Sequence, residues 1–377
     1  MAKVELDAYH RLYEMAQPLE IVGRWQLSAD AHTEILSEHF GDERDICVLY
    51  CGTATKRNPI DTEKAISAAG FGTRVTTVDL NSRPLRKLGR EYMPTLADAT
   101  RLPFAAGEFN VITSDFLFNM MPLSAVDSIV CEWSRVLSES GVISTTVFLA
   151  ETDKENWYTT GLRNIAAKHF FSREALSVVF AAHGFSLRME DRELSQRPWL
   201  YHSQEYTHIT AIKADDEAQR RQAQKMLALG ERMTRVINSE SGMAKTDLGE
   251  VLTELIRGDF ALEFDTNGEV VGWARKLDYA NDWSEIGSVW VDVAHRGQGI
   301  ALKLTKQLIE DGEQRRWWSA TENPAMARVL EKCGFAPKTM TYLPLGVLIG
   351  VVRERGRVAG RLHQVMTRSK REIWIKD

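Results

Sequence analysis

The segment Val289–Leu304 (VWVDVAHRGQGIALKL) constrains the fold of this chain more than any other. An apolar, strand-like run leads into Arg296-Gly297-Gln298-Gly299-Ile300-Ala301, and an amphipathic helical pattern follows. Small residues at such a junction expose successive backbone N–H groups, and the helix N-terminus adds its positive dipole end. Arg296 adds a full positive charge. The segment therefore predicts a pyrophosphate-binding turn between a strand and a helix. The alternative is a surface turn with chance glycines.

A second block, Asn323–Phe335 (NPAMARVLEKCGF), follows at a short distance. The two blocks resemble motifs A and B of the GNAT acyltransferases, and Gly268–Ala274 (GEVVGWA) also matches that family. The resemblance implies a mixed α/β domain that binds acetyl-CoA or another acyl-CoA through the turn from Arg296 to Ala301 and through Asn323. It also implies a bulge in the preceding strand, with backbone groups of Val291 and Val293 holding the pantetheine arm.

GNAT enzymes transfer the acyl group directly to an amine, which must be neutral to attack, so a general base helps. By resemblance, Glu285 is the catalytic base, because family members of the histone type carry a glutamate at this place in the strand. A solvated carboxylate at a strand end is the alternative. Many members protonate the leaving thiolate with a motif B tyrosine. That position is Leu330 here, Tyr342 is the nearest substitute, and Cys333 is a poor acid.

Strand and helix signals alternate through the first half of the chain, which predicts a parallel sheet with right-handed crossovers. A helix is expected over about Ala125–Leu137. The expected strands are Ile46–Cys51, Arg74–Asp79, Phe109–Ser114, Gly141–Phe148, Ser186–Arg192 and Tyr206–Lys213.

Three residues follow the ends of these first strands. Gly52 permits a tight turn after the first strand, and Asp79 ends the second. Ligands of open α/β sheets bind beyond the carboxyl ends of the strands. A carboxylate there can accept both hydroxyls of a ribose, and Asp98, in Ala97-Asp98-Ala99, could accept from an adenine amine. The alternative for each aspartate on its own is a solvent-exposed loop residue without a ligand-binding role.

Residues 40–213 resemble a class I S-adenosylmethionine-dependent methyltransferase domain, through VLYCGTATK, VTTVD, ADATRLPFAAGEFNVITS and EWSRVLSESGVIS. The resemblance implies a Rossmann-like sheet. In it Gly52 lies beside the methionine part of the cofactor, Asp79 holds the ribose, and Asp98 with Ala99 holds the adenine. Asp115 and Asn119 follow the strand that often carries substrate-side residues, and a structural role for them is equally open.

The first loop departs from the family pattern of an acidic residue followed by three alternating glycines. The acidic position is Tyr50, and the second and third glycines are Ala54 and Lys56. Lys56 places a long cation where the backbone should approach the cofactor. These departures predict that S-adenosylmethionine binds weakly or not at all, so that the methyltransferase half is degenerate.

Length and composition exclude several classes of protein. The 377 residues suggest two domains, and the net charge of −5 provides no global attraction to nucleic acid or membrane. The longest apolar run, Leu343–Val352, is too short to span a bilayer, and the N-terminus lacks a secretory pattern. The four cysteines lack zinc-site spacing, so we expect no metal, four buried thiols and a cytoplasmic location.

The expected domains are residues 1–213, 214–344 and a basic extension, 345–377, that completes or flanks the second domain. A polar helix over Asp215–Arg235 marks the first boundary. The extension carries eight basic and three acidic residues, which suggests a solvated or docking helix or a surface for an anionic acceptor or nucleic acid. The crowded tryptophans of the second half are expected to be core residues rather than an acceptor pocket.

These observations favour an acyl-CoA-dependent N-acyltransferase, acting on a small-molecule or macromolecular amine, fused to a methyltransferase-like domain. Two alternatives stay open. In one, both halves are active and modify one acceptor. In the other, the protein is a non-catalytic binding scaffold.

Overall fold

The structure is a computed structural model of the 377-residue chain. It describes residues 34, 36–40, 45–53, 57–150, 169–193, 205–240, 243, 245–279, 282–312, 314–339, 342–356 and 373–376.

The chain divides into two compact units. Unit 1 comprises residues 1–231 and 247–252, and unit 2 comprises residues 232–246 and 253–377. The division falls within helix α8 (Glu217–Ser239), the polar helix that the sequence predicts. Helix α9 (Leu248–Arg257) is also shared between the units, because its residues up to Leu252 belong to unit 1 and those from Thr253 belong to unit 2. The predicted boundaries at 213/214 and 344/345 stay predictions.

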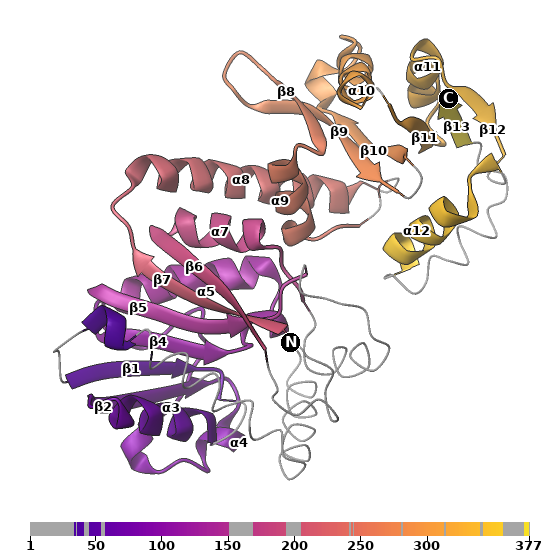
Figure 1. The fold of residues 1–377 in the computed structure, drawn as a ribbon. Helices are drawn as coiled ribbons and strands as arrows, with labels where there is room; N and C mark the ends of the chain where they lie inside the picture. The colour runs from indigo at the N-terminus through magenta and orange to yellow at the C-terminus, as the bar shows by residue number, and fades with distance from the viewer. Residues whose placement is uncertain are drawn as a thin grey trace. The chain divides into compact units, whose positions relative to one another are not determined.

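Unit 1 is built on a seven-stranded sheet of order β3-β2-β1-β4-β5-β7-β6 (Figure 1). Strand β7 runs antiparallel to its neighbours β5 and β6, and the other pairs are parallel. All six predicted strands are present, and short β3 was not expected. The strands are β1 (Asp45–Cys51), β2 (Gly72–Asp79), β3 (Pro94–Leu96), β4 (Phe109–Asp115), β5 (Leu137–Val147), β6 (Phe185–Glu193) and β7 (Glu205–Lys213).

Helices cover both faces of this sheet. On one face, α5 (Leu123–Val136), α7 (Arg173–Ala182) and the start of α8 share a core with Leu49, Ile112 and Ile143. On the other, α3 (Arg57–Ala68) and the helical residues 36–40 pack on Val48 and Val111. Shorter helices are α4 (Ser82–Leu85), η2 (Arg90–Tyr92) and η3 (Phe118–Met120).

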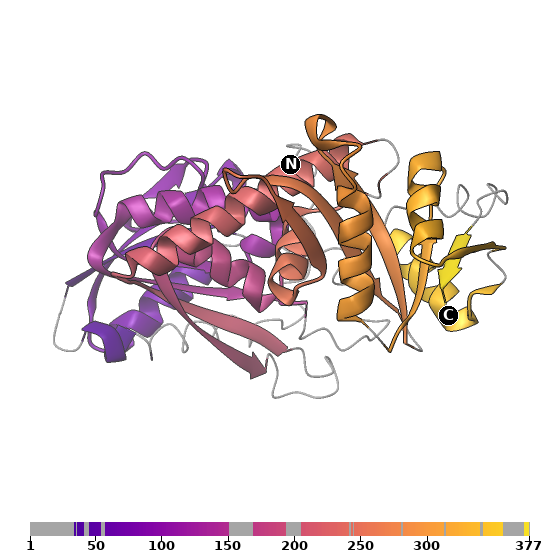
Figure 2. The ribbon, with the colours of Figure 1, turned by 90° about the horizontal axis from the view of Figure 1, so that it is seen from above.

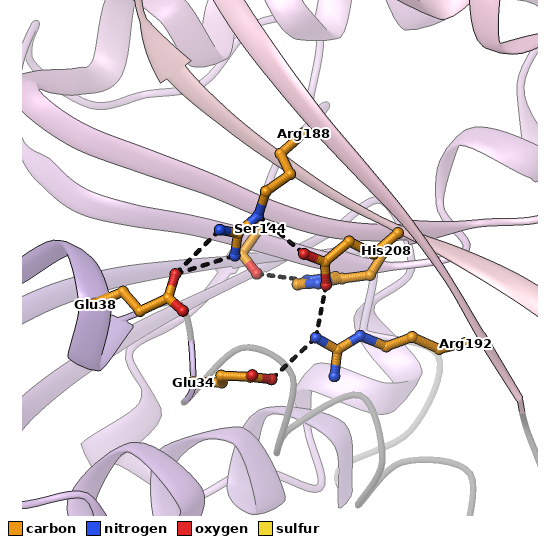
Figure 3. A network of polar contacts seen from close by, with 7 residues as sticks. Glu34, Glu38, Ser144, Arg188, Arg192 and His208 are labelled. Carbon is orange, nitrogen blue, oxygen red and sulfur yellow. Dashed lines mark hydrogen bonds and ion pairs between the residues drawn. The ribbon is translucent and has the colours of Figure 1, made fainter.

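Two ion pairs fasten the helical residues Glu34 and Glu38 to β6 (Figure 3). Arg188 contacts Glu38 at 3.1 Å and Arg192 contacts Glu34 at 3.0 Å. On the same face of the sheet, Ser144 Oγ and His208 Nε2 form a buried hydrogen bond of 2.9 Å. The exposed ion pairs add little stability but fix which edge strand these helical residues contact.

Unit 2 is built on a six-stranded mixed sheet of order β12-β13-β11-β10-β9-β8 (Figure 2). The strands are β8 (Phe260–Phe264), β9 (Val270–Asp278), β10 (Trp283–Val291), β11 (Arg316–Ala320), β12 (Ala336–Lys338) and β13 (Ile373–Lys376). Helices α10 (Ile300–Asp311) and α11 (Pro324–Lys332) contribute Leu304 and Leu330 to a core with Ile286 and Trp317. Helix α12 (Leu345–Gly356) packs with Trp283 and Trp318 in a separate cluster. Short η4 (Val293–His295) precedes α10.

The C-terminal extension completes this sheet, because β13 lies between β11 and β12. Of its basic residues, Arg353 and Arg355 lie in α12, whereas those from Arg357 to Arg371 lie outside the described residues. In the part of the chain that the structure describes, no helix has the length and hydropathy of a membrane span. Cys131 on α5 is exposed, so the expectation of four buried thiols is wrong for this residue, which lies on the solvent side of an amphipathic helix.

Candidate functional site

Strand β10 carries the bulge that the sequence predicts. Its register against β9 pairs Gly287 with Arg275 and Trp290 with Trp273, so β10 uses one more residue than β9 between these pairs. Ser288 lies at the irregularity with a φ of 48°, a left-handed conformation that a non-glycine residue adopts rarely. The bulge bends β10 in the middle of the sheet.

Strands β10 and β11 separate at the same place. Their parallel register ends at Glu285 opposite Trp318, and just beyond it Ser319 Oγ donates to the Ile286 carbonyl at 2.7 Å. Strand β10 continues to Val291 paired with β9, but no described residue of β11 is in register with it there. We call the region beyond Glu285 and Trp318, where β10 and β11 are no longer in register, the opening; strand β10 forms one side of it.

The turn before α10 is shaped to receive an anion. Gly297 and Gly299 both have a φ of 80°, and a Cβ on either would meet nothing within 4 Å. Gly299 caps α10 without any side-chain hydrogen bond, so the first N–H groups of that helix are available to a ligand. Arg296 is exposed, and its Nε donates to the Val291 carbonyl at 3.1 Å, which fastens the turn to the end of β10.

Glu285 lies at the last pair of the β10–β11 register, opposite Trp318. Its side chain is 3% exposed, so the alternative of a solvated strand-end carboxylate is wrong. The Tyr279 hydroxyl donates to Glu285 Oε2 at 2.8 Å. A buried carboxylate needs such a donor, because an unpaired charge is costly away from water.

In unit 1, the carboxyl ends of β1 and β2 are joined through Asp79. Gly52 has a φ of 79°, which favours glycine, and its N–H donates to the Val78 carbonyl at 2.9 Å. The Asp79 carboxylate accepts from the backbone N–H groups of Asn81, Thr53 and Leu80. Burial nevertheless raises the pKa of Asp79 to about 7.

Asp98 follows β3 in an exposed turn. Its Oδ1 accepts from the N–H and the hydroxyl of Thr100, at 2.9 and 2.8 Å. Ala99 packs against the core of unit 1. The following loop is fixed by Glu132, which accepts from the Leu102 N–H at 2.7 Å. Gly52, Asp79 and Asp98 thus follow adjacent strands at one edge of the sheet.

Comparisons with known proteins identify one domain in each half of the chain. Residues 62–145 match the family profile of a methyltransferase domain, and residues 240–335 match that of the acetyltransferase (GNAT) family. The chain combines a methyltransferase domain with a GNAT acetyltransferase domain. No curated protein gives a significant match.

Solved structures similar to this chain include two methyltransferases. Burkholderia thailandensis 1,6-didemethyltoxoflavin-N1-methyltransferase is 19% identical over 57% of this chain and 89% of its own, with a TM-score of 0.42. Haemonchus contortus phosphoethanolamine N-methyltransferase 2 is 13% identical over 48% of this chain and 52% of its own, with a TM-score of 0.37.

The other predicted residues of the GNAT domain lie in η4, at the start of α10 and just before α11. Asn323 caps α11, where its Oδ1 accepts from the Ala325 N–H at 2.9 Å. Ile300 is buried beneath the turn, whereas Gln298 and Ala301 lie on the turn and the first turn of α10. Val293 lies in η4 and is 73% exposed. Val293 therefore lies two residues beyond the end of β10, because Asp292 accepts from the Ala294 N–H and starts η4.

The residues at and near the position of the missing motif B tyrosine differ in their surroundings. Leu330 is fully buried, and burial raises the pKa of Cys333. Tyr342 is 51% exposed, with Lys338 Nζ 5.2 Å from its ring centre. The tryptophans are core residues as expected, except that Trp290 is half-buried and stacks on Trp273.

In the methyltransferase domain, the tyrosine at the acidic position of the first loop is hydrogen-bonded to Asp115. The hydroxyl of fully buried Tyr50 donates to Asp115 Oδ2 at 2.5 Å, and Thr146 donates to Asp115 Oδ1. Asn119 is fully buried and exchanges hydrogen bonds with Phe148, so both Asp115 and Asn119 have structural roles. Ala54 and Lys56 lie outside the described residues.

Proposed function

We propose that this protein is an acyl-CoA-dependent N-acyltransferase, with acetyl as the acyl group and a primary amine as the acceptor. One observation carries the proposal. The bulge and the separation from β11 both lie in β10, and the uncapped glycine turn of α10 follows that strand after η4. A strained bulge with no function would cost stability, which favours a ligand-binding role.

Each part of the opening has a role in this proposal. The N–H groups from Gly297 to Ala301 hold the pyrophosphate, and backbone groups of β10 up to Val291 pair with the pantetheine arm. Acyl-CoA supplies the thioester carbonyl that the amine attacks. Glu285 receives the proton that the amine loses, directly or through one water.

Calorimetry with acetyl-CoA tests the cofactor site. The chain should bind acetyl-CoA with micromolar or tighter affinity, and Gly299→Glu should abolish the heat by placing a side chain and a negative charge in the turn. Gly258→Glu is a matched control, because Gly258 also has a left-handed φ, of 77°, with nothing within 4 Å of its Cβ position. No heat with the unaltered chain, or equal loss in both variants, would refute the site.

The methyltransferase half supports a second proposal, that it binds S-adenosylmethionine weakly or not at all. The family match begins at residue 62 and so excludes the altered glycine loop. Asp79 is 8% exposed and already accepts three backbone N–H groups, which leaves it poorly placed for a ribose diol. The bifunctional alternative requires this residue to bind the ribose.

Calorimetry with S-adenosylmethionine separates these alternatives. Weak or absent heat supports a degenerate site. If the unaltered chain binds tightly and Asp79→Ala abolishes binding, the domain is a working cofactor site and the bifunctional enzyme is favoured. Absence of acyl transfer to any amine, despite bound acetyl-CoA, would favour the scaffold alternative.

A further inference from the structure

We infer that Tyr279 positions the catalytic carboxylate of Glu285, an inference that rests on the proposed acyltransferase function. Tyr279 directly follows β9, and the hairpin between β9 and β10 brings it to Glu285, six residues later in the chain. Its N–H donates to the Trp283 carbonyl at 2.8 Å, which closes the hairpin. Its hydroxyl donates to Glu285 Oε2, also at 2.8 Å.

This hydrogen bond sets which way the carboxylate faces. Oε2 is turned toward Tyr279. Oε1 lies 3.8 Å from the position that a Cβ on Gly287 would occupy. Gly287 follows the point where β10 and β11 separate, and it precedes the bulge. Oε1 therefore lies toward Gly287, in the direction in which β10 and β11 are no longer in register, while Tyr279 holds Oε2.

The Tyr279 hydroxyl provides a polar contact to Glu285 among side chains that are largely apolar. The residues in register with Glu285 on the two neighbouring strands are Leu277 and Trp318, both apolar along most of their surface. The Tyr279 ring packs on Trp318 with ring centres 5.8 Å apart, so the hydroxyl itself is held in place. A rigid donor removes rotamers of Glu285 in which neither oxygen faces the opening, which is how a positioning residue accelerates a reaction.

Steady-state kinetics on the full chain test the inference. Acetyl-CoA and a panel of primary amines identify an acceptor through release of the CoA thiol. We expect Tyr279→Phe to lower kcat about 10–100-fold, the effect of one hydrogen bond to a charged group. The Kd of acetyl-CoA should not change. In the Glu285→Gln background, Tyr279→Phe should cause no further loss, because the carboxylate that it orients is gone.

A second measurement needs no acceptor. The infrared bands of the Glu285 carboxylate appear in the difference between the unaltered chain and Glu285→Gln. Loss of the tyrosine hydrogen bond should shift these bands in Tyr279→Phe. Tyr92→Phe makes the same chemical change at a half-buried tyrosine of unit 1 and should leave the bands and kcat unchanged.

The two measurements separate failure of the inference from failure of the proposed function. Unshifted bands in Tyr279→Phe, or losses of kcat that simply multiply in the double variant, would overturn the role of Tyr279 alone. Bound acetyl-CoA with no turnover on any amine would overturn both. A Tyr279→Phe variant with a raised Kd for acetyl-CoA would show a structural role in the cofactor site instead.

Discussion

Among single residues, buried Asp79 couples the folding of unit 1 to pH. Burial raises its pKa to about 7 in the folded chain, against an ordinary value near 4 in the unfolded chain. The folded state therefore holds this proton more tightly. The resulting stabilisation is complete below about pH 4 and is lost as pH rises through about 7, by roughly 1.4 kcal/mol per unit of pKa difference.

Asp79→Asn should remove this pH dependence. The variant loses one acceptor at every pH, so it should be less stable than the unaltered chain at pH 4. Between pH 4 and pH 8, the free energy of unfolding of the variant should rise by about 4 kcal/mol relative to that of the unaltered chain. This is the stabilisation that the unaltered chain loses when Asp79 ionises. Urea unfolding at both pH values measures the change. A constant difference between the two proteins would show that Asp79 titrates normally.

Glu285→Gln tests the proposed base. Turnover should fall by ~10²–10⁴, the usual contribution of general base catalysis, while the Kd of acetyl-CoA stays the same. The loss should shrink as pH rises, because more of the acceptor amine is then neutral without help. Acyl transfer measured against pH for both proteins checks this, and superimposable profiles would show that Glu285 is not the base.

The sequence predicts the place of Glu285 and Asp79 but not their surroundings. The position of each residue can be read from a nearby sequence pattern. Glu285 precedes the glycine turn by a fixed number of residues, and Asp79 is the last residue of a recognisable strand. The Tyr279 hydrogen bond depends on the path of the β9–β10 hairpin, and the Tyr50–Asp115 pair on the register of β1 with β4. Neither contact has a local pattern that would reveal it.

At the level of elements, the packing of α10 on β9 depends on Gly272. A Cβ there would lie 2.9 Å from Ile300 Cγ2 and 3.2 Å from the Trp290 carbonyl oxygen. Gly272→Ala should therefore push the first turn of α10 off the sheet, lower stability by about 1–3 kcal/mol and weaken acetyl-CoA binding. Thermal unfolding and calorimetry measure the two effects.

A compensating change tests the cause. Ile300→Leu removes the β-branched methyl that Gly272→Ala would meet, so the double variant should regain part of the lost stability. If Gly272→Ala costs as much stability in the Ile300→Leu background as in the unaltered chain, the steric explanation is wrong.

The helices and strands that the sequence predicts are those whose apolar residues follow a clear helical or strand pattern. Strands such as β1 and β9 are apolar runs bounded by turn residues, and α5 has one apolar face. Strand β3, which the sequence does not predict, and α12, which is predicted only as one interpretation of the basic extension, lack such signals. Strand β3 has three residues and begins with Pro94, and α12 contains Gly346 and Gly350 in an apolar run without helical period. Tertiary packing on Trp283 and Trp318 stabilises α12 despite these glycines.

At the level of the whole molecule, composition and motifs predict two domains but place their boundary by a change in polarity at 213/214. The structure shows where the first half of α8 packs. The first half of α8 is polar on most of its surface, yet Ala223 and Leu227 belong to the core of unit 1 together with Leu248 and Leu252 of α9. An isolated helix pattern cannot reveal which sheet its narrow apolar stripe covers.

Truncation at the predicted boundary should therefore destabilise unit 1. A fragment of residues 1–213 lacks the four core residues of α8 and α9, and each buried leucine contributes roughly 1.5–3 kcal/mol. A fragment of residues 1–257 keeps them. It also keeps the close contact at Gly230, where a Cβ would lie 2.7 Å from Leu252. The shorter fragment should unfold at a clearly lower urea concentration and bind more hydrophobic dye. Equal midpoints for the two fragments would mean that α8 and α9 contribute nothing to this core, and that the polarity change at 213 is the true boundary.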